Sequence, residues 1–180
     1  MKKLLLLLIL LPFISNAQSQ FSDRLETDVI DETTHDVVKR CFWQVFERGN
    51  FRKNINTFYR ISSINGNYYL ELKVMHGGDI FVVPRNGEFK LRLENGDQIT
   101  LLNSEYKVTT TGAGARGWAG SDVQGVYLTF PIANKDMITL LHNYVDRIRL
   151  YTGDGYIEKR IPEYHSELFM DEIALVYYSK

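Results

Sequence analysis

The chain has 180 residues, with 21 Lys and Arg against 22 Asp and Glu, so its formal net charge is −1. A near-neutral chain whose basic runs never exceed two residues lacks the electrostatic footprint expected of a nucleic-acid or anionic-membrane binder. Its single cysteine excludes an intrachain disulfide. Cys41 stands beside Phe42 and Trp43, which is typical of a small buried hydrophobic side chain.

Residues 1–17 have the three parts of a secretory signal peptide. Two lysines precede an apolar run over residues 4–14, and small residues lead to an expected cleavage after Ala17. A transmembrane helix needs about 20 apolar residues, which makes an uncleaved anchor the weaker alternative. No cysteine follows the run within a few residues to carry a lipid. We therefore expect a single exported domain, residues 18–180, with no membrane span, in the periplasm, at the cell surface or outside the cell.

The first part of this domain, to about residue 127, is typical of short strands separated by turns. Asn-Gly pairs accept the positive φ angles of two-residue hairpin turns. Residues 88–93 alternate apolar and charged side chains, which predicts a strand with one buried and one wet face. The pairs predict an antiparallel meander, and they are Asn65-Gly66, Asn86-Gly87 and Asn95-Gly96.

Residues 37–47 fit two patterns. Their apolar side chains fall on a helical stripe, but the segment is rich in β-branched and aromatic residues. Such residues are enriched in strands, so we favour a strand over a helix.

After Pro131 the pattern changes to helix, strand, strand, helix. Asn134 can cap a short helix over residues 135–142. A hairpin is expected from residues 147–151 and 156–161, and a last helix over residues 163–177. The tail is too small to form its own core. The predicted fold is therefore mainly β within the α+β class: a twisted antiparallel meander or sandwich with this segment packed on it.

This layout resembles small exported proteins of uncharacterised function from bacteria of the Bacteroides type. The resemblance is carried by the β meander, a Gly-rich loop, the stretch NKDMITLLHNYVDRIRLYTGDGYIEKRI and a terminal helix. It implies a bacterial envelope origin. The motifs are structural, so the resemblance brings no catalytic residue with it.

The Gly-rich loop offers the one candidate ligand site. Residues 112–117 match the G-x-G-x-x-G pattern, but a strand follows where a dinucleotide fold needs a helix, so no nucleotide cofactor is expected. Arg116, Trp118 and Asp122 could instead offer a stacking face and charged groups to a glycan or peptide. In the alternative, Trp118 folds onto the core and the glycines only allow the chain to cross between strands.

Other constellations give weaker signals. His76-Gly77-Gly78-Asp79 lacks the G-x-S-x-G elbow that would accompany an oxyanion hole, and the remaining histidines lack metal-ligand spacing. We therefore predict no catalytic residue and no metal site. Paired carboxylates, which a glycosidase would need, occur at three places: Asp31-Glu32, Asp171-Glu172, and Glu26 with Asp28 on one face of a strand.

The sequence thus favours a non-enzymatic, exported binding or interaction module for an unknown protein, peptide or glycan. The alternative is an exported hydrolase that uses paired carboxylates. A binding module predicts an exposed patch near Trp118 without buried, strongly shifted carboxylates. A hydrolase predicts two inward-facing acids in one polar cleft.

Overall fold

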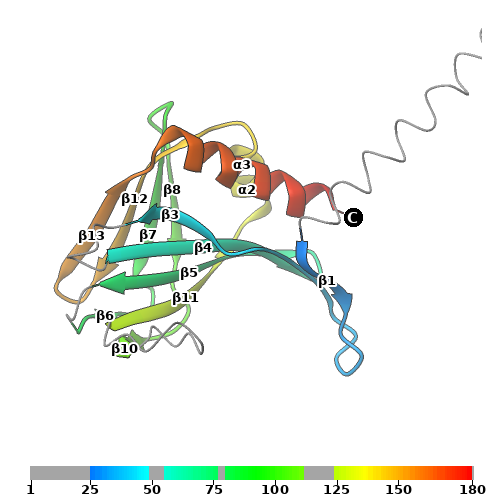
Figure 1. Ribbon diagram of the computed structural model, residues 1–180, viewed down its shortest axis with the longest axis horizontal. Coiled ribbons are helices and arrows are strands. Elements are labelled where there is room, and N and C mark those ends of the chain that lie inside the picture. Colours follow the sequence, from blue (N-terminus) through cyan, green and yellow to red (C-terminus); the bar gives the residue numbers. More distant parts are fainter. Residues whose placement is uncertain (1–24, 49–54, 77–79, 112–123, 180) are drawn as a thin grey trace, which may run out of the picture.

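The computed structural model describes residues 25–48, 55–76, 80–111 and 124–179, which form antiparallel sheets and two helices (Figure 1). The large sheet has seven strands in the order β1-β2-β4-β5-β11-β10, with β3 also paired to β4. The four-stranded sheet has the order β13-β12-β7-β8, and β6 pairs with β9 in a short ribbon. The predicted mainly β, α+β fold is confirmed.

The strands of the large sheet are β1 (Leu25–Ile30), β2 (Val37–Cys41), β3 (Gln44–Arg48), β4 (Ile55–Ile64), β5 (Asn67–His76), β10 (Thr110–Thr111) and β11 (Gln124–Ile132). Those of the four-stranded sheet are β7 (Glu88–Leu93), β8 (Gln98–Leu102), β12 (Val145–Thr152) and β13 (Gly155–Arg160), and the ribbon consists of β6 (Val82–Val83) and β9 (Lys107–Val108). The helices are α2 (Asn134–Leu140) and α3 (Glu163–Tyr178).

Two of the three Asn-Gly pairs make the predicted hairpins. Asn65-Gly66 joins β4 to β5 with φ angles of 52° and 77°. Asn95-Gly96 lies in the connection from β7 to β8, but only Gly96 has a positive φ there, so this hairpin lacks the predicted two-residue turn. The prediction for Asn86-Gly87 is wrong, because β6 pairs with β9 and not with β7. Gly87 serves close packing instead: a Cβ there would lie 2.8 Å from the Pro84 carbonyl oxygen.

Residues 37–47 form strands, as favoured, but the segment is broken into β2 and β3. Both pair with β4, Arg40 opposite Ser62 and Gln44 opposite Tyr59. Between these two pairs, residues 41–43 of the first segment lie opposite only residues 60–61 of β4. The extra residue makes a β-bulge at Phe42 and Trp43. Cys41, just before the bulge, is fully buried as predicted.

The core lies between the inner faces of the two sheets and beneath α3. Phe89 of β7 and Phe130 of β11 meet with ring centroids 5.3 Å apart, which joins the sheets. Phe169 of α3 packs on Phe46 and Tyr59 of the large sheet, at 5.1 Å from each. Each such aromatic or aliphatic side chain contributes roughly 1.5–3 kcal/mol through burial.

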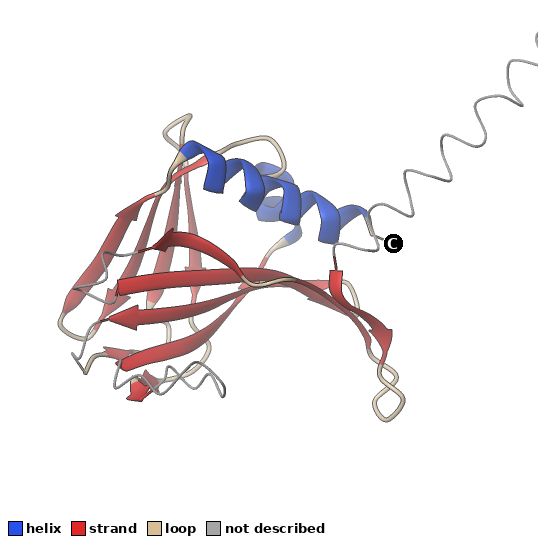
Figure 2. Ribbon diagram, viewed as in Figure 1, coloured by secondary structure: helices blue, strands red, loops and turns tan. Residues whose placement is uncertain are grey.

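The C-terminal segment has the predicted helix, strand, strand, helix order, and both helices lie on one side of the strands (Figure 2). Its hairpin is built into the fold, because β12 pairs with β7 and so completes the four-stranded sheet. Asn134 does not cap α2: it is the first helical residue, Ala133 occupies the cap position, and no side chain caps the helix. Within the described ranges, neither helix is long and apolar enough to cross a bilayer.

Candidate functional site

A cluster of polar side chains covers the outer face of the large sheet. Inward positions on β4, β5 and β11 carry buried apolar and aromatic residues, and the alternate positions point outward. The outward side chains gather around one indole ring, so we call them the Trp43 cluster. Its members are Glu26, Arg40, Trp43, Arg60, Ser62, Glu71, Lys73 and Tyr127.

Glu71 is the centre of the Trp43 cluster and is only 4 % exposed, although it lies on an outer face. Arg60, opposite it in the ladder, donates from Nε to Oε2 at 2.8 Å and brings Nη2 within 2.7 Å of the same oxygen. Ser62 donates from Oγ to Oε1 at 2.7 Å, and the Tyr127 hydroxyl donates to Oε2. Arg40 Nε lies 3.8 Å from Oε1. Both carboxylate oxygens are therefore bonded.

These bonds decide the charge of Glu71. Burial raises the pKa of its carboxyl, but the hydrogen bonds from Arg60, Tyr127 and Ser62 outweigh burial and hold the pKa below its ordinary value of 4.5. Glu71 is therefore ionised at neutral pH. A carboxylate that is ionised and fully bonded is suited to positioning its neighbours and unsuited to donating a proton as a general acid.

Trp43 lies over the cations of this cluster. The Arg60 guanidinium carbon is 4.7 Å from the ring centroid, the Lys73 ammonium is 3.9 Å from it, and Tyr127 meets the ring edge-on at 6.1 Å. The two cations come from adjacent strands of the large sheet, Arg60 from β4 and Lys73 from β5. Trp43 is only partly buried.

Lys73 is held in an unfavourable position for its charge. Burial lowers the pKa of its ammonium, and the nearby Arg60 guanidinium lowers it further. The Trp43 ring attracts the Lys73 ammonium, as do the Glu26 and Glu71 carboxylates, and the contact with Lys73 holds the indole ring in return.

A second carboxylate, Glu26, joins the cluster through Arg60, whose Nη1 donates to Glu26 Oε2 at 2.9 Å. The prediction that Glu26 and Asp28 share one face of a strand is wrong. The ladder between β1 and β2 shifts register between Leu25 and Thr27, which turns Glu26 outward. Asp28 stands opposite Lys39, whose ammonium bonds to a carbonyl at the end of α3 on the inner side.

The other two predicted carboxylate pairs do not form an acidic cleft. Asp31 and Glu32 are both exposed in the turn after β1, where Asp31 Oδ1 accepts backbone N–H bonds from the two following threonines. Asp171 is exposed on α3, whereas Glu172 is buried under the helix. Neither pair therefore places two inward-facing acids side by side.

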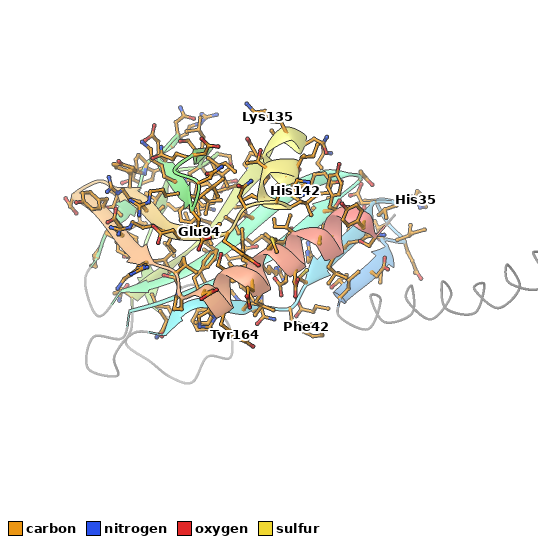
Figure 3. The ribbon with its side chains drawn as sticks, turned by 90° about the horizontal axis from the view of Figure 1, so that it is seen from above. His35, Phe42, Glu94, Lys135, His142 and Tyr164 are labelled. Carbon is orange, nitrogen blue, oxygen red and sulfur yellow. The ribbon has the colours of Figure 1, made fainter. Side chains whose placement is uncertain are left out.

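The histidines lie apart. His35 lies in the turn before β2 and His142 just after α2 (Figure 3), whereas His165 lies in the first turn of α3. Among the residues that the structure describes, no three His, Cys, Asp or Glu side chains form a group that could hold a metal ion.

The predicted binding residues Arg116, Trp118 and Asp122 lie outside the described residues, as do residues 112–117 and 77–79 of the two glycine motifs. The described strand that follows the Gly-rich loop is β11, and it carries Tyr127 of the Trp43 cluster.

Sequence reasoning missed the Trp43 cluster, although part of it could have been found. A two-residue turn at Asn65-Gly66 pairs Ile64 with Asn67, and counting back along both strands pairs Arg60 with Glu71. Trp43 had no such signal, because its place depends on the bulge between β2 and β3.

No protein-family model, no curated protein and no solved structure matches this chain.

Proposed function

We propose that this protein is an exported, non-enzymatic binding module of the bacterial envelope, and that Trp43 forms its platform for a neutral glycan. The observation that carries the proposal is a partly buried indole ring that is held by Arg60 and Lys73 on the outer face of the large sheet. An open aromatic face stacks well on the apolar face of a sugar ring, and polar groups at its rim can bond the hydroxyls.

Preorganisation supports this role. Binding is weakened when side chains must be ordered on contact with the ligand, and a fixed ring avoids that loss. Trp43 is fixed by two cations and by the edge of Tyr127, and Arg60 is itself fixed by Glu71. The Glu71 carboxylate thus acts through Arg60 to hold the platform.

The buried carboxylate also separates this proposal from the hydrolase alternative. An acid catalyst of glycoside hydrolysis needs a carboxyl with a raised pKa. Glu71 has a lowered pKa, and Arg60 stands between it and Glu26. This pair is therefore better suited to binding than to bond cleavage.

The platform is tested by Trp43→Ala, with Phe42→Ala as the matched control. Phe42 is the neighbouring aromatic residue, 49 % exposed at the rim of the molecule (Figure 3). Electrophoresis through gels that contain soluble starch, hydroxyethylcellulose or galactomannan should retard the wild-type protein and Phe42→Ala with at least one polysaccharide, and Trp43→Ala with none. Equal retardation of all three proteins, or no retardation of the wild type, contradicts the proposal.

A second readout does not require Trp43 to be removed. The chain has two tryptophans, so Trp118→Phe leaves Trp43 as the only one. Addition of the retarding polysaccharide should shift its emission to shorter wavelength and shield it from iodide.

The complementary variant Trp43→Phe tests the Gly-rich loop: blue-shifted emission insensitive to iodide would place Trp118 in the core and remove that loop as a binding site.

The export part of the proposal rests on residues 1–17. Expression in a Gram-negative host followed by N-terminal sequencing should give a mature chain that begins at Gln18. A cytoplasmic chain that retains Met1 would contradict it.

A further inference from the structure

The outer face of the four-stranded sheet carries a row of three arginines. Arg92 on β7, Arg147 on β12 and Arg160 on β13 are direct cross-strand partners. Neighbouring strands lie about 4.8 Å apart, and like charges directly opposite one another destabilise a sheet. Lys90 and Arg149 form the next pair of opposed cations on the same face. We call these five cations the arginine face.

Three carboxylates hold the arginine face together without neutralising it. Asp146 lies 3.1 Å from Arg92 Nε and 3.4 Å from Arg160 Nε. Glu158 accepts bonds from Arg147 at 2.7 Å and Arg149 at 2.6 Å.

Lys90 pairs with the third carboxylate, Glu88, at 2.9 Å. The face therefore has two more cations than contacting carboxylates, whereas the whole chain has a net charge of −1.

Two arginines of the face are largely open to solvent, and its other three cations are partly exposed. The side chain of Arg92 is 50 % exposed and that of Arg160 is 80 % exposed. A cavity of about 250 Å³ on this face is lined by four of its cations and three other residues: Lys90, Arg92, Arg147 and Arg149, with Gln98, Ile148 and Glu158. At one end Arg149 stacks at 4.4 Å on the ring of Tyr156, which is itself exposed.

We propose that the arginine face binds an acidic polysaccharide whose sugars carry carboxylates. Guanidinium groups bind carboxylates through paired N–H donors, and the row of arginines repeats this donor set across three strands. Glu158 and Asp146 accept hydrogen bonds from sugar hydroxyls, and Tyr156 offers a ring face to the adjacent sugar. A ligand that is both anionic and rich in hydroxyls satisfies all of these groups.

A nucleic acid fits the face less well. Duplex DNA carries one negative charge per about 1.7 Å, so its binding sites need a large excess of cations. Here the excess is two, and the Glu158 and Asp146 carboxylates among the arginines would face phosphates that have no proton to donate.

The test is calorimetric titration of the protein with polygalacturonate oligosaccharides, with dextran as a neutral polymer and a single-stranded DNA oligonucleotide of equal charge number for comparison. The variant is Arg147→Gln combined with Arg160→Gln. The matched control is Lys107→Gln, which removes an exposed cation that pairs with Glu105 on the short ribbon. Thermal melts show whether each variant is folded.

Polygalacturonate should bind wild type and Lys107→Gln equally, bind the double arginine variant roughly three- to tenfold more weakly, and bind less at higher salt. Dextran should not compete with polygalacturonate for the arginine face. The proposal is overturned if polygalacturonate does not bind, if the double variant binds it as tightly as wild type, or if the oligonucleotide binds more tightly. Trp43→Ala should leave this binding unchanged, so the two proposed sites succeed or fail separately.

Discussion

The outer faces of the two sheets use the same chemistry, arginine against carboxylate, in opposite ways. In the Trp43 cluster the central carboxylate, Glu71, is buried, both of its oxygens are bonded, and an aromatic ring lies above its partner Arg60. On the arginine face the cations outnumber the contacting carboxylates and reach into solvent. Burial thus separates the two sets of ion pairs: the buried pair holds the Trp43 ring in place, and the more exposed set leaves cations open to solvent.

The largest expected effect is the loss of the buried carboxylate. Glu71→Ala removes one of the two carboxylates that pair with Arg60 and leaves Glu26 as the other. The protein should be destabilised by about 3–5 kcal/mol, because removal of one member of a buried ion pair leaves an uncompensated charge. Glu158→Ala on the arginine face should cost clearly less, since its arginines remain solvated. Urea unfolding at pH 7 measures both. Equal losses for the two variants would refute the contrast in burial.

Acid should act on the buried carboxylate as well. The pKa of Glu71 is lower in the folded chain than its ordinary value of 4.5. Its contribution to stability is therefore complete above about pH 4.5 and is lost as the pH falls through the folded-state pKa. The free energy of unfolding of Glu71→Gln should fall less steeply below pH 4.5 than that of the wild type. Parallel curves for the two proteins would contradict this.

A matched pair of tyrosines probes single hydrogen bonds. Tyr127→Phe removes a donor to the buried Glu71 and should destabilise by about 1.5–3 kcal/mol, the range for hydrogen bonds to charged groups. Tyr151→Phe removes an acceptor from the exposed Arg149 and should have a much smaller effect. Denaturant titration of both variants gives the comparison, and a larger effect for Tyr151→Phe would count against it.

The smallest expected effect is at the edge of the arginine face. Arg160→Gln removes one of three opposed arginines and should change the free energy of unfolding by less than about 0.5 kcal/mol. At low salt the variant should be slightly more stable than the wild type, because repulsion between the opposed arginines is relieved. Melting temperatures at 20 and 500 mM NaCl measure this. A loss at low salt that disappears at high salt would mean that Arg160 is a net stabilising partner of Asp146.

The parts of the fold that depend on neighbouring residues could be predicted from the sequence. The Asn65-Gly66 hairpin, the last helix and the C-terminal hairpin each follow from a local turn or periodicity. The Asn86-Gly87 hairpin was predicted wrongly because an Asn-Gly pair marks a turn but does not determine which strands it joins. At Asn134 a capping residue type was present, but the helix begins one residue too early for it to cap.

The two proposed binding faces depend on contacts between residues that are distant in the sequence. The row of arginines exists because β12 pairs with β7, which brings Asp146 to Arg92 across 54 positions of sequence. Basic residues at alternate strand positions, Lys90 with Arg92 and Arg147 with Arg149, were a usable signal. A search for consecutive basic residues missed it, because alternate positions of a strand share a face.

The account's central claim is that the two faces are separate binding sites, and crossed titration tests it most directly. Wild type, Trp43→Ala and the Arg147→Gln, Arg160→Gln variant are each titrated with polygalacturonate and with the neutral polysaccharide that retards the wild type. We expect Trp43→Ala to lose the neutral ligand and keep the acidic one, and the arginine variant to do the reverse. Loss of both ligands in either folded variant, or of neither in both, would contradict the account.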